Sequence, residues 1–298
     1  MTNLYYTMDE KWAGKTCLAK SPPIPYDTQM INKALALLLC FLVLATPSTL
    51  AQAPKTVFLE ELTWTELQDQ IRSGKTTIIV PIGGTEQNGP QMALGKHNVR
   101  VKLLSEKIAQ TLGNTLVAPV ISYVPEGAIS PPAAHMRFPG TITVPDKTFE
   151  TTLEYAARSF KLHGFHDVVF LGDHGGYQKD LTIVAQRLNR EWAATPVRAH
   201  AIEEYYRASE TTYVQALRGR DYRNSEIGTH AGLADTSLML ALDPRLVRMD
   251  RMGSAAQLGR TEGVYGDPHR SSAELGQLGV DAIVTQTVDA IRKAVARR

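Results

Sequence analysis

Three short segments of the chain, each bordered by glycine, carry acids, amides and imidazoles that could build a metal or acid–base site. The first, residues 84–90, reads GTEQNGP, and His97 follows it closely. A carboxylate such as Glu86, placed directly after a buried strand, can face a cavity because the flanking glycines let the backbone turn tightly. The alternative is a plain turn in which Glu86 and Asn88 accept hydrogen bonds from backbone amides. The spacing alone leaves both interpretations open.

The second segment, residues 172–177, reads GDHGGY and centres on His174. A histidine at a strand end, beside the acid Asp173 and two glycines, can offer one ring nitrogen to a metal while a neighbouring group orients the other. The competing interpretation is an ordinary hydrogen-bonded histidine, and the pattern does not decide between them.

The third segment, residues 229–237, reads THAGLADTS and leads into an apolar stretch. His230 and Asp235 are five residues apart, about 140° around a helix, so they would not share one helical face. If both reach one site, His230 must lie at or before the start of the helix, where Thr229 would be a suitable N-cap. Alternatively, Asp235 only favours the helix N-terminus electrostatically.

The elements that position these segments follow from the alternation of apolar runs and amphipathic stretches. Strands are predicted at residues 76–82, 116–123, 167–171 and 197–201. Helices are predicted at residues 99–112, 149–162, 181–192, 233–242 and 275–295. Strands that alternate with helices of this length favour an α/β fold with a mostly parallel sheet covered on both faces. Ligands bind beyond the carboxyl ends of the strands in such sheets, and the first two segments begin there.

Composition limits the class of protein. The chain has 298 residues and a net charge of +2 with its basic residues evenly spread, which argues against a nucleic-acid partner and for a small molecule. No linker-like stretch interrupts the middle of the chain, so residues 54–298 are predicted to form one domain.

The N-terminal part has the features of an export signal. Residues 30–53 combine Lys33, an apolar stretch over about residues 34–45, and a small-residue AQA end, the three parts of a signal peptide. The apolar stretch is too short to span a bilayer comfortably, so no membrane anchor is expected after cleavage. Residues 1–29 are interpreted as an upstream extension outside the fold, and the mature protein is predicted to be periplasmic or secreted. The alternative is a cytoplasmic protein in which the apolar run is a structural helix.

Cysteine usage agrees with this division. Cys17 and Cys40 both precede the predicted mature chain, which therefore has neither a disulfide framework nor thiol chemistry. Any metal must be held by imidazole, carboxylate or amide groups.

The three segments, in this order, resemble the motifs of the creatininase (creatinine amidohydrolase) family. Those motifs are roughly Gly-x-x-Glu-Gln-His-Gly-Pro, Asn-Gly-His-Gly-Gly-Asn and His-Ala-Gly-x-x-Glu-Thr-Ser. Residues 135–141 (HMRFPGT) and 263–268 (GVYGDP) resemble two further family stretches, so the resemblance runs from about Ile78 to Ala273. It implies a three-layer α/β/α protein, often hexameric, in which one or two divalent metals activate water against a linear or cyclic amide.

Carried over by resemblance, Glu86 and His174 match metal ligands, and His230 matches a proton-transfer histidine. Asp235 falls where the family has a Glu that binds metal or orients the neighbouring histidine. Two departures stand in the first segment: Asn88 replaces a ligand histidine, and His97 replaces a bridging aspartate.

Other departures lie in the second segment, where Asp173 replaces glycine and Tyr177 replaces asparagine. A neutral histidine at position 97 holds two cations poorly, because it lacks the negative charge of a bridging carboxylate. One ion is therefore predicted rather than two.

The prediction is a metal-dependent amidohydrolase and homo-oligomer with one Zn²⁺, or alternatively Mn²⁺ or Fe²⁺. Its metal ligands are predicted to be Glu86, His97, His174 and Asp235. Its catalytic residues are predicted to be His230, as proton donor to the leaving nitrogen, together with Asn88 and Asp173. The alternative is a non-catalytic small-molecule or metal-binding protein that kept the fold with a degenerate site.

Overall fold

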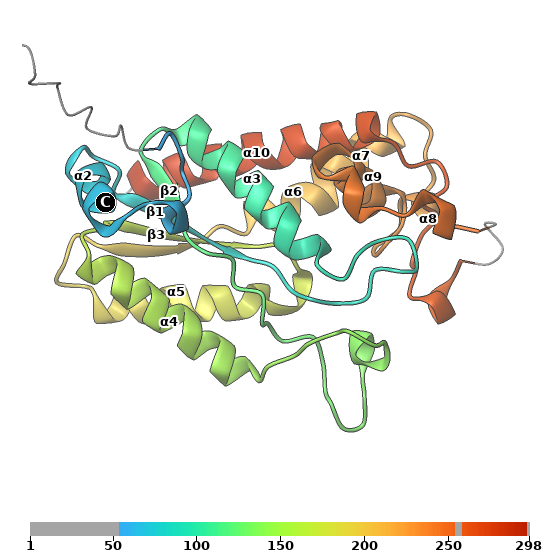
Figure 1. Ribbon diagram of the computed structural model, residues 1–298, viewed down its shortest axis with the longest axis horizontal. Coiled ribbons are helices and arrows are strands. Elements are labelled where there is room, and N and C mark those ends of the chain that lie inside the picture. Colours follow the sequence, from blue (N-terminus) through green and yellow to red (C-terminus); the bar gives the residue numbers. More distant parts are fainter. Residues whose placement is uncertain (1–53, 254–257, 297–298) are drawn as a thin grey trace, which may run out of the picture. The chain divides into compact units, whose positions relative to one another are not determined.

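A parallel four-stranded sheet forms the centre of the computed structural model, which describes residues 54–253 and 258–296 (Figure 1). Its strands are β1 (Thr77–Ile82), β2 (Thr115–Val117), β3 (Asp167–Gly172) and β4 (Arg198–Ala201). They lie in the order β2-β1-β3-β4, and every neighbouring pair is parallel. The predicted signal peptide at residues 30–53 and the extension at residues 1–29 lie outside the described residues.

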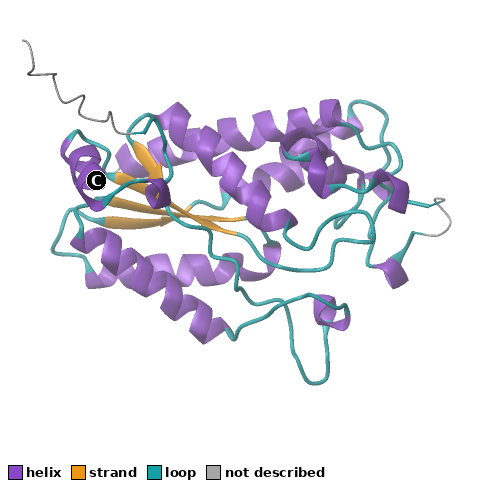
Figure 2. Ribbon diagram, viewed as in Figure 1, coloured by secondary structure: helices purple, strands orange, loops and turns teal. Residues whose placement is uncertain are grey.

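Helices cover both faces of the sheet (Figure 2). The longer ones are α2 (Trp64–Arg72), α3 (Lys96–Leu112), α4 (Asp146–Leu162), α5 (Gln178–Glu191), α9 (Leu233–Leu242) and α10 (Ala273–Ala296). The shorter ones are α6 (Glu204–Ala208), the π-helical η4 (Ser209–Tyr213), α7 (Val214–Arg218) and α8 (Asn224–Ile227). In Figure 1, α4 and α5 lie on one side of the sheet and α3 and α10 on the other. The predicted three-layer α/β/α arrangement is confirmed.

Alternation of side chains along the strands explains the layering, since successive residues of a strand point to opposite faces. Ile78 and Val80 of β1 pack with Phe149 of α4 in one apolar cluster. Ile79, between them, packs with Leu104 of α3 in a second cluster. Because both faces are buried, β1 is a continuous apolar run rather than an alternating one.

The sheet order creates a switch point between β1 and β3. From β1 the chain moves first outward to β2 and then back to β3 on the other side, so the connections that follow β1 and β3 diverge at this edge. Crevices at such points are the usual ligand sites of open α/β sheets. The first segment follows β1 and the second follows β3, so both start at this crevice.

The predicted strands and long helices are confirmed, with changes at their ends. The strand expected at residues 116–123 is wrong over most of its length, since β2 ends at Val117. Pro119 lacks the amide hydrogen that a strand ladder needs, and beyond it only an isolated bridge joins Ile121 to Ile82. The long helices α3, α4 and α5 begin about three residues before the predicted positions. Within the described ranges, no helix combines the length and apolarity required to cross a bilayer.

Candidate metal centre

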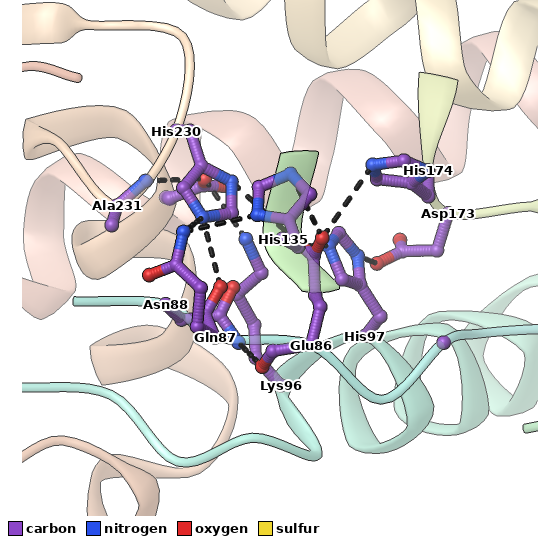
Figure 3. Close-up of polar contacts among 12 residues, drawn as sticks. Glu86, Gln87, Asn88, Lys96, His97, His135, Asp173, His174, His230 and Ala231 are labelled. Carbon is purple, nitrogen blue, oxygen red and sulfur yellow. Dashed lines mark hydrogen bonds and ion pairs between the residues drawn. The ribbon is translucent and has the colours of Figure 1, made fainter. Parts of the chain in front are cut away.

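Glu86 is completely buried and lies among four histidines (Figure 3). Its Oε1 is 2.7 Å from His97 Nε2 and 3.7 Å from His230 Nδ1. Its Oε2 is 3.2 Å from His135 Nε2 and 3.6 Å from His174 Nε2. All four imidazoles therefore turn a nitrogen toward one carboxylate.

Five different stretches of chain deliver these side chains. Glu86 comes from the loop after β1, His97 from the first turn of α3, and His174 from the end of β3. His230 lies two residues before Gly232, the N-cap of α9, so its predicted place before the helix is confirmed and the predicted N-cap at Thr229 is wrong. The 3₁₀ helix η2 (Ala134–Arg137) of the long β2–α4 connection carries the fourth histidine.

Two of the histidines border backbone that is unusual for a residue with a side chain. Ala134 precedes His135 with φ 48°, and Ala231 follows His230 with φ 54°. Non-glycine residues in this left-handed region carry strain and are enriched at functional sites. The Ala231 amide donates to Asp235 Oδ2 at 3.0 Å, which helps to hold the strained turn.

Gln87 fixes the orientation of two rings. Its side-chain Nε2 donates to His135 Nδ1 at 3.0 Å, and its backbone carbonyl accepts from His230 Nε2 at 2.9 Å. The Gln87 side-chain amide also lies 3.1 Å from His230 Nε2, so this ring nitrogen donates to the Gln87 carbonyl in one tautomer and accepts from the Gln87 amide in the other.

Burial keeps three of the imidazoles neutral near pH 7. It lowers the pKa of His174 to about 4 and that of His230 to about 3, and it also lowers the pKa of His135, although the Glu86 charge opposes each shift. A neutral imidazole has a lone pair for a metal or a proton.

Two carboxyl groups in the centre have pKa values that are shifted in opposite directions. Burial raises the pKa of Glu86, but the neighbouring His97 and Lys96 more than offset this and hold it well below its usual range. Burial and the nearby Glu86 charge raise the pKa of Glu126 to about 9. Among the described residues, neither oxygen of Glu126 nor Glu86 Oε2 has a hydrogen-bond donor. Buried acceptors of this kind require a proton or a cation.

The donor atoms form two groups that fit a divalent ion. Glu86, His135 and His230 make one group, and Glu86, Glu126 and His174 make the other. Within each group, one atom per residue lies within 4.8 Å of the others. Imidazole and carboxylate donors suit Zn²⁺ and Mn²⁺.

His97, a predicted ligand, belongs to neither group. Its Nε2 contacts Glu86, and its Nδ1 is 2.6 Å from Asp173 Oδ2. Asp173 also accepts from Arg100 Nε at 2.8 Å and from the Tyr205 hydroxyl at 2.7 Å. The structure thus places Asp173 behind His97, where it holds the ring that contacts Glu86.

The other predicted site residues lie at the edge of the centre. Asp235 contacts Lys96 Nζ at 3.0 Å and Arg100 Nη1 at 2.6 Å, and it too lies outside both groups. Asn88 is buried and stabilises the turn by donating to the carbonyls of Glu86 and Ala93. The plain-turn interpretation expected it to accept from backbone amides instead, but its Oδ1 has no hydrogen-bond partner among the described residues.

Sequence reasoning missed two members of the groups. His135 stands in one of the family-like stretches but was assigned no role, because a lone histidine on a loop carries no spacing signal. Glu126 has no motif around it, and nothing in the sequence indicates that it returns to Glu86.

A cavity of ≈ 160 Å³ opens beside the centre. All four histidines line it, together with Tyr206 and Leu238. The volume is close to that of engineered cavities that hold benzene, about 150 Å³, so it suits a small molecule.

Comparisons with known proteins agree with this geometry. The creatininase family model, described as creatinine amidohydrolase, matches residues 60–291. The chain is 26% identical over 258 residues to creatinine amidohydrolase of Pseudomonas putida, which covers 80% of this chain and 97% of that protein. It is 25% identical over 240 residues to the mycofactocin precursor peptide peptidase of Mycolicibacterium smegmatis, covering 77% and 90%. A solved structure described as creatininase Mn aligns with a TM-score of 0.65 at 26% identity, covering 80% and 99%.

Proposed function

Because the chain belongs to the creatininase family, we propose that it is a metal-dependent hydrolase that cuts a carbon–nitrogen bond in a small linear or cyclic amide. The observation that supports this most directly is the position of Glu86, a buried carboxylate shared by two groups of candidate ligands at the carboxyl ends of β1 and β3. The relatives named for creatinine amidohydrolysis and for peptide cleavage both break such bonds.

In this proposal, Glu86 and the other members of one of the two groups hold a single divalent ion, with Zn²⁺ preferred over Mn²⁺ or Fe²⁺. A bound ion of this kind lowers the pKa of a water toward about 7 and polarises a carbonyl. His230 would take up the proton that the attacking water loses and pass it to the leaving nitrogen, because its neutral ring lines the cavity and is held beside the Gln87 carbonyl. Lys96 and Arg100 supply positive charge on the cavity wall.

The test is metal analysis of the purified protein, followed by hydrolysis assays on a panel of creatinine, lactams, hydantoins and linear amides. We expect one divalent ion per chain, loss of hydrolysis after chelation, and recovery when Zn²⁺ or Mn²⁺ is added back. Protein that binds no divalent ion and gains no activity from added ions would contradict the proposal.

A second candidate function is metal or small-molecule binding without catalysis. The contacts of His97 motivate it. By resemblance this position carries a bridging aspartate in the family, but here both ring nitrogens of the histidine contact carboxylates. Stoichiometric metal binding with no hydrolysis across the whole panel would favour this function over the first.

We also propose that the protein is exported after removal of residues 1–53 and acts as a homo-oligomer. The signal-like composition of residues 30–53 supports the export. Cell fractionation with N-terminal sequencing tests it, since the mature chain should begin at Pro54. Light scattering of the mature protein tests the assembly.

A further inference from the structure

We infer that Glu126 is a metal ligand and that it holds a single divalent ion together with Glu86 and His174. The inference rests on the proposed metal-dependent function and adds a ligand that neither the sequence motifs nor the comparisons assign. Glu126 follows β2 and reaches the switch point from a different stretch of chain than the other two ligands.

The first support is the isolation of the Glu126 carboxyl group. The residue is 4% exposed, and neither of its oxygens receives a hydrogen bond from any described group. Glu86 Oε2, in the same group, is equally without a donor. Two buried acceptors that face each other repel unless a cation or a proton lies between them.

The second support is distance. Ligand atoms about 2.1 Å from a tetrahedral ion lie about 3.4 Å from one another. His174 Nε2 is 3.6 Å from Glu86 Oε2 and 3.9 Å from Glu126 Oε2. A contraction of a few tenths of an ångström brings these atoms to coordination distances, and the fourth position is left for water.

The third support is the space made for Glu126. Gly84 has φ 148°, and a Cβ built on it would lie only 2.6 Å from Glu126 Oε1. The backbone of the first segment therefore passes directly against this carboxylate. Val124 Cγ2 lies 3.2 Å from the same Cβ position, so a side chain at position 84 would meet Val124 as well as Glu126.

Coordination requires one local change at His174. Its Nδ1 accepts from the Gly176 amide at 3.1 Å, whereas a metal on Nε2 needs the ring proton on Nδ1. The Gly176 amide must then turn away from His174 Nδ1. The pair Gly175–Gly176 allows that turn, because glycine tolerates backbone conformations that other residues resist.

The other group of candidate ligands fits a proton-transfer role better. His135 and His230 are both tied to Gln87, and each lies on a strained turn that fixes its ring. His97 is held between Glu86 and Asp173, so it orients the Glu86 carboxylate.

The competing explanation is a proton shared between Glu86 and Glu126. Replacement Glu126→Gln distinguishes the shared proton from the bound metal, because glutamine imitates a protonated acid but is a poor metal ligand. The matched control is Glu154→Gln, a buried carboxylate between α4 and α5 that is paired with Arg158 and Arg187.

Three quantities are measured on wild type and both variants: bound metal per chain, the dissociation constants of Zn²⁺ and Mn²⁺, and the rise in unfolding temperature on adding either ion. We expect Glu126→Gln to bind both ions at least tenfold more weakly and to lose most of the metal-induced rise in unfolding temperature. Glu154→Gln should bind them like wild type.

Glu126→Asp serves as a second variant if the glutamine variant does not fold, and its shortened carboxylate should give an intermediate affinity. Wild-type affinity in the variants at position 126 would overturn the inference while leaving the proposed function intact. If wild type itself binds no ion, the proposed function fails instead.

Discussion

Asp235 balances two buried cations. Lys96 is 1% exposed and Arg100 is 5% exposed, and both direct a nitrogen at the Asp235 carboxylate. Burial raises the pKa of Asp235, but the positive charges of Lys96 and Arg100 more than offset this and hold it well below its usual range. The residue that resemblance places with the metal ligands is therefore engaged in an ion-pair network in the cavity wall.

Replacement Asp235→Asn should lower the free energy of unfolding by about 3 kcal/mol, because it leaves Lys96 and Arg100 without full compensation. The side chain is 18% exposed, which puts the expected cost at the lower end of the range for buried pairs. Urea unfolding measures this cost, and metal analysis of the same variant should find the wild-type content. Loss of the ion without loss of stability would instead make Asp235 a ligand, as the sequence suggested.

At the scale of elements, one hydroxyl group joins the ends of β1 and β3. Tyr177 is fully buried, and its hydroxyl donates to the Gly83 carbonyl at 2.6 Å. The same oxygen accepts from the amides of Asp173 and His174, each at 3.1 Å. The residue that departs from the family motif thus ties together the two loops that carry Glu86 and His174.

Replacement Tyr177→Phe should cost about 1–3 kcal/mol of stability, because it leaves buried backbone groups without a partner. It should also weaken metal binding, since the loop that carries His174 loses its anchor to β1. Unfolding curves and metal titration check both effects. The control is Tyr155→Phe on α4, whose ring is 65% exposed and which should change neither.

Elements formed by long runs of periodically spaced apolar residues were predictable from the sequence, and short elements were not. The runs that form β1 and β3 and the helices α9 and α10 have enough residues for their periodicity to be unambiguous. The helices α6 to α8 are five residues or shorter, so no period can be recognised in them. The capped helix α2 was also missed, although Thr63 and Glu66 form a capping box at its start.

The candidate site was predictable only where a motif marks it. Glu86 and His174 follow strands, and the sheet brings strand ends together whatever the loops do. Glu126 and His135 come from the long connection between β2 and α4, whose path depends on tertiary contacts such as the hydrogen bond between Gln87 and His135. Such long-range contacts cannot be inferred from the local sequence.

At the scale of the whole molecule, the match to the creatininase family covers the part of the chain that carries the sheet and its helices. Both apolar clusters of the sheet consist of side chains from residues 57–295, and the family model spans residues 60–291.

Because the family model matches residues 60–291, a chain that starts at Pro54 should fold with the same unfolding temperature and the same metal content as the full-length protein. Differential scanning calorimetry and metal analysis of the two chains make the comparison. Loss of cooperative unfolding in the shorter chain would favour the alternative in which the apolar run of residues 34–45 is structural.

The contact between Gly84 and Glu126 also constrains how relatives of this protein can diverge. A side chain at position 84 would displace the Glu126 carboxylate from its present place, because its Cβ would lie 2.6 Å from Glu126 Oε1. The two residues should therefore be inherited jointly, and homologues that carry any larger residue at the first position should have lost the acid at the second. An aligned set of such homologues would then separate into two lineages with differently built metal sites.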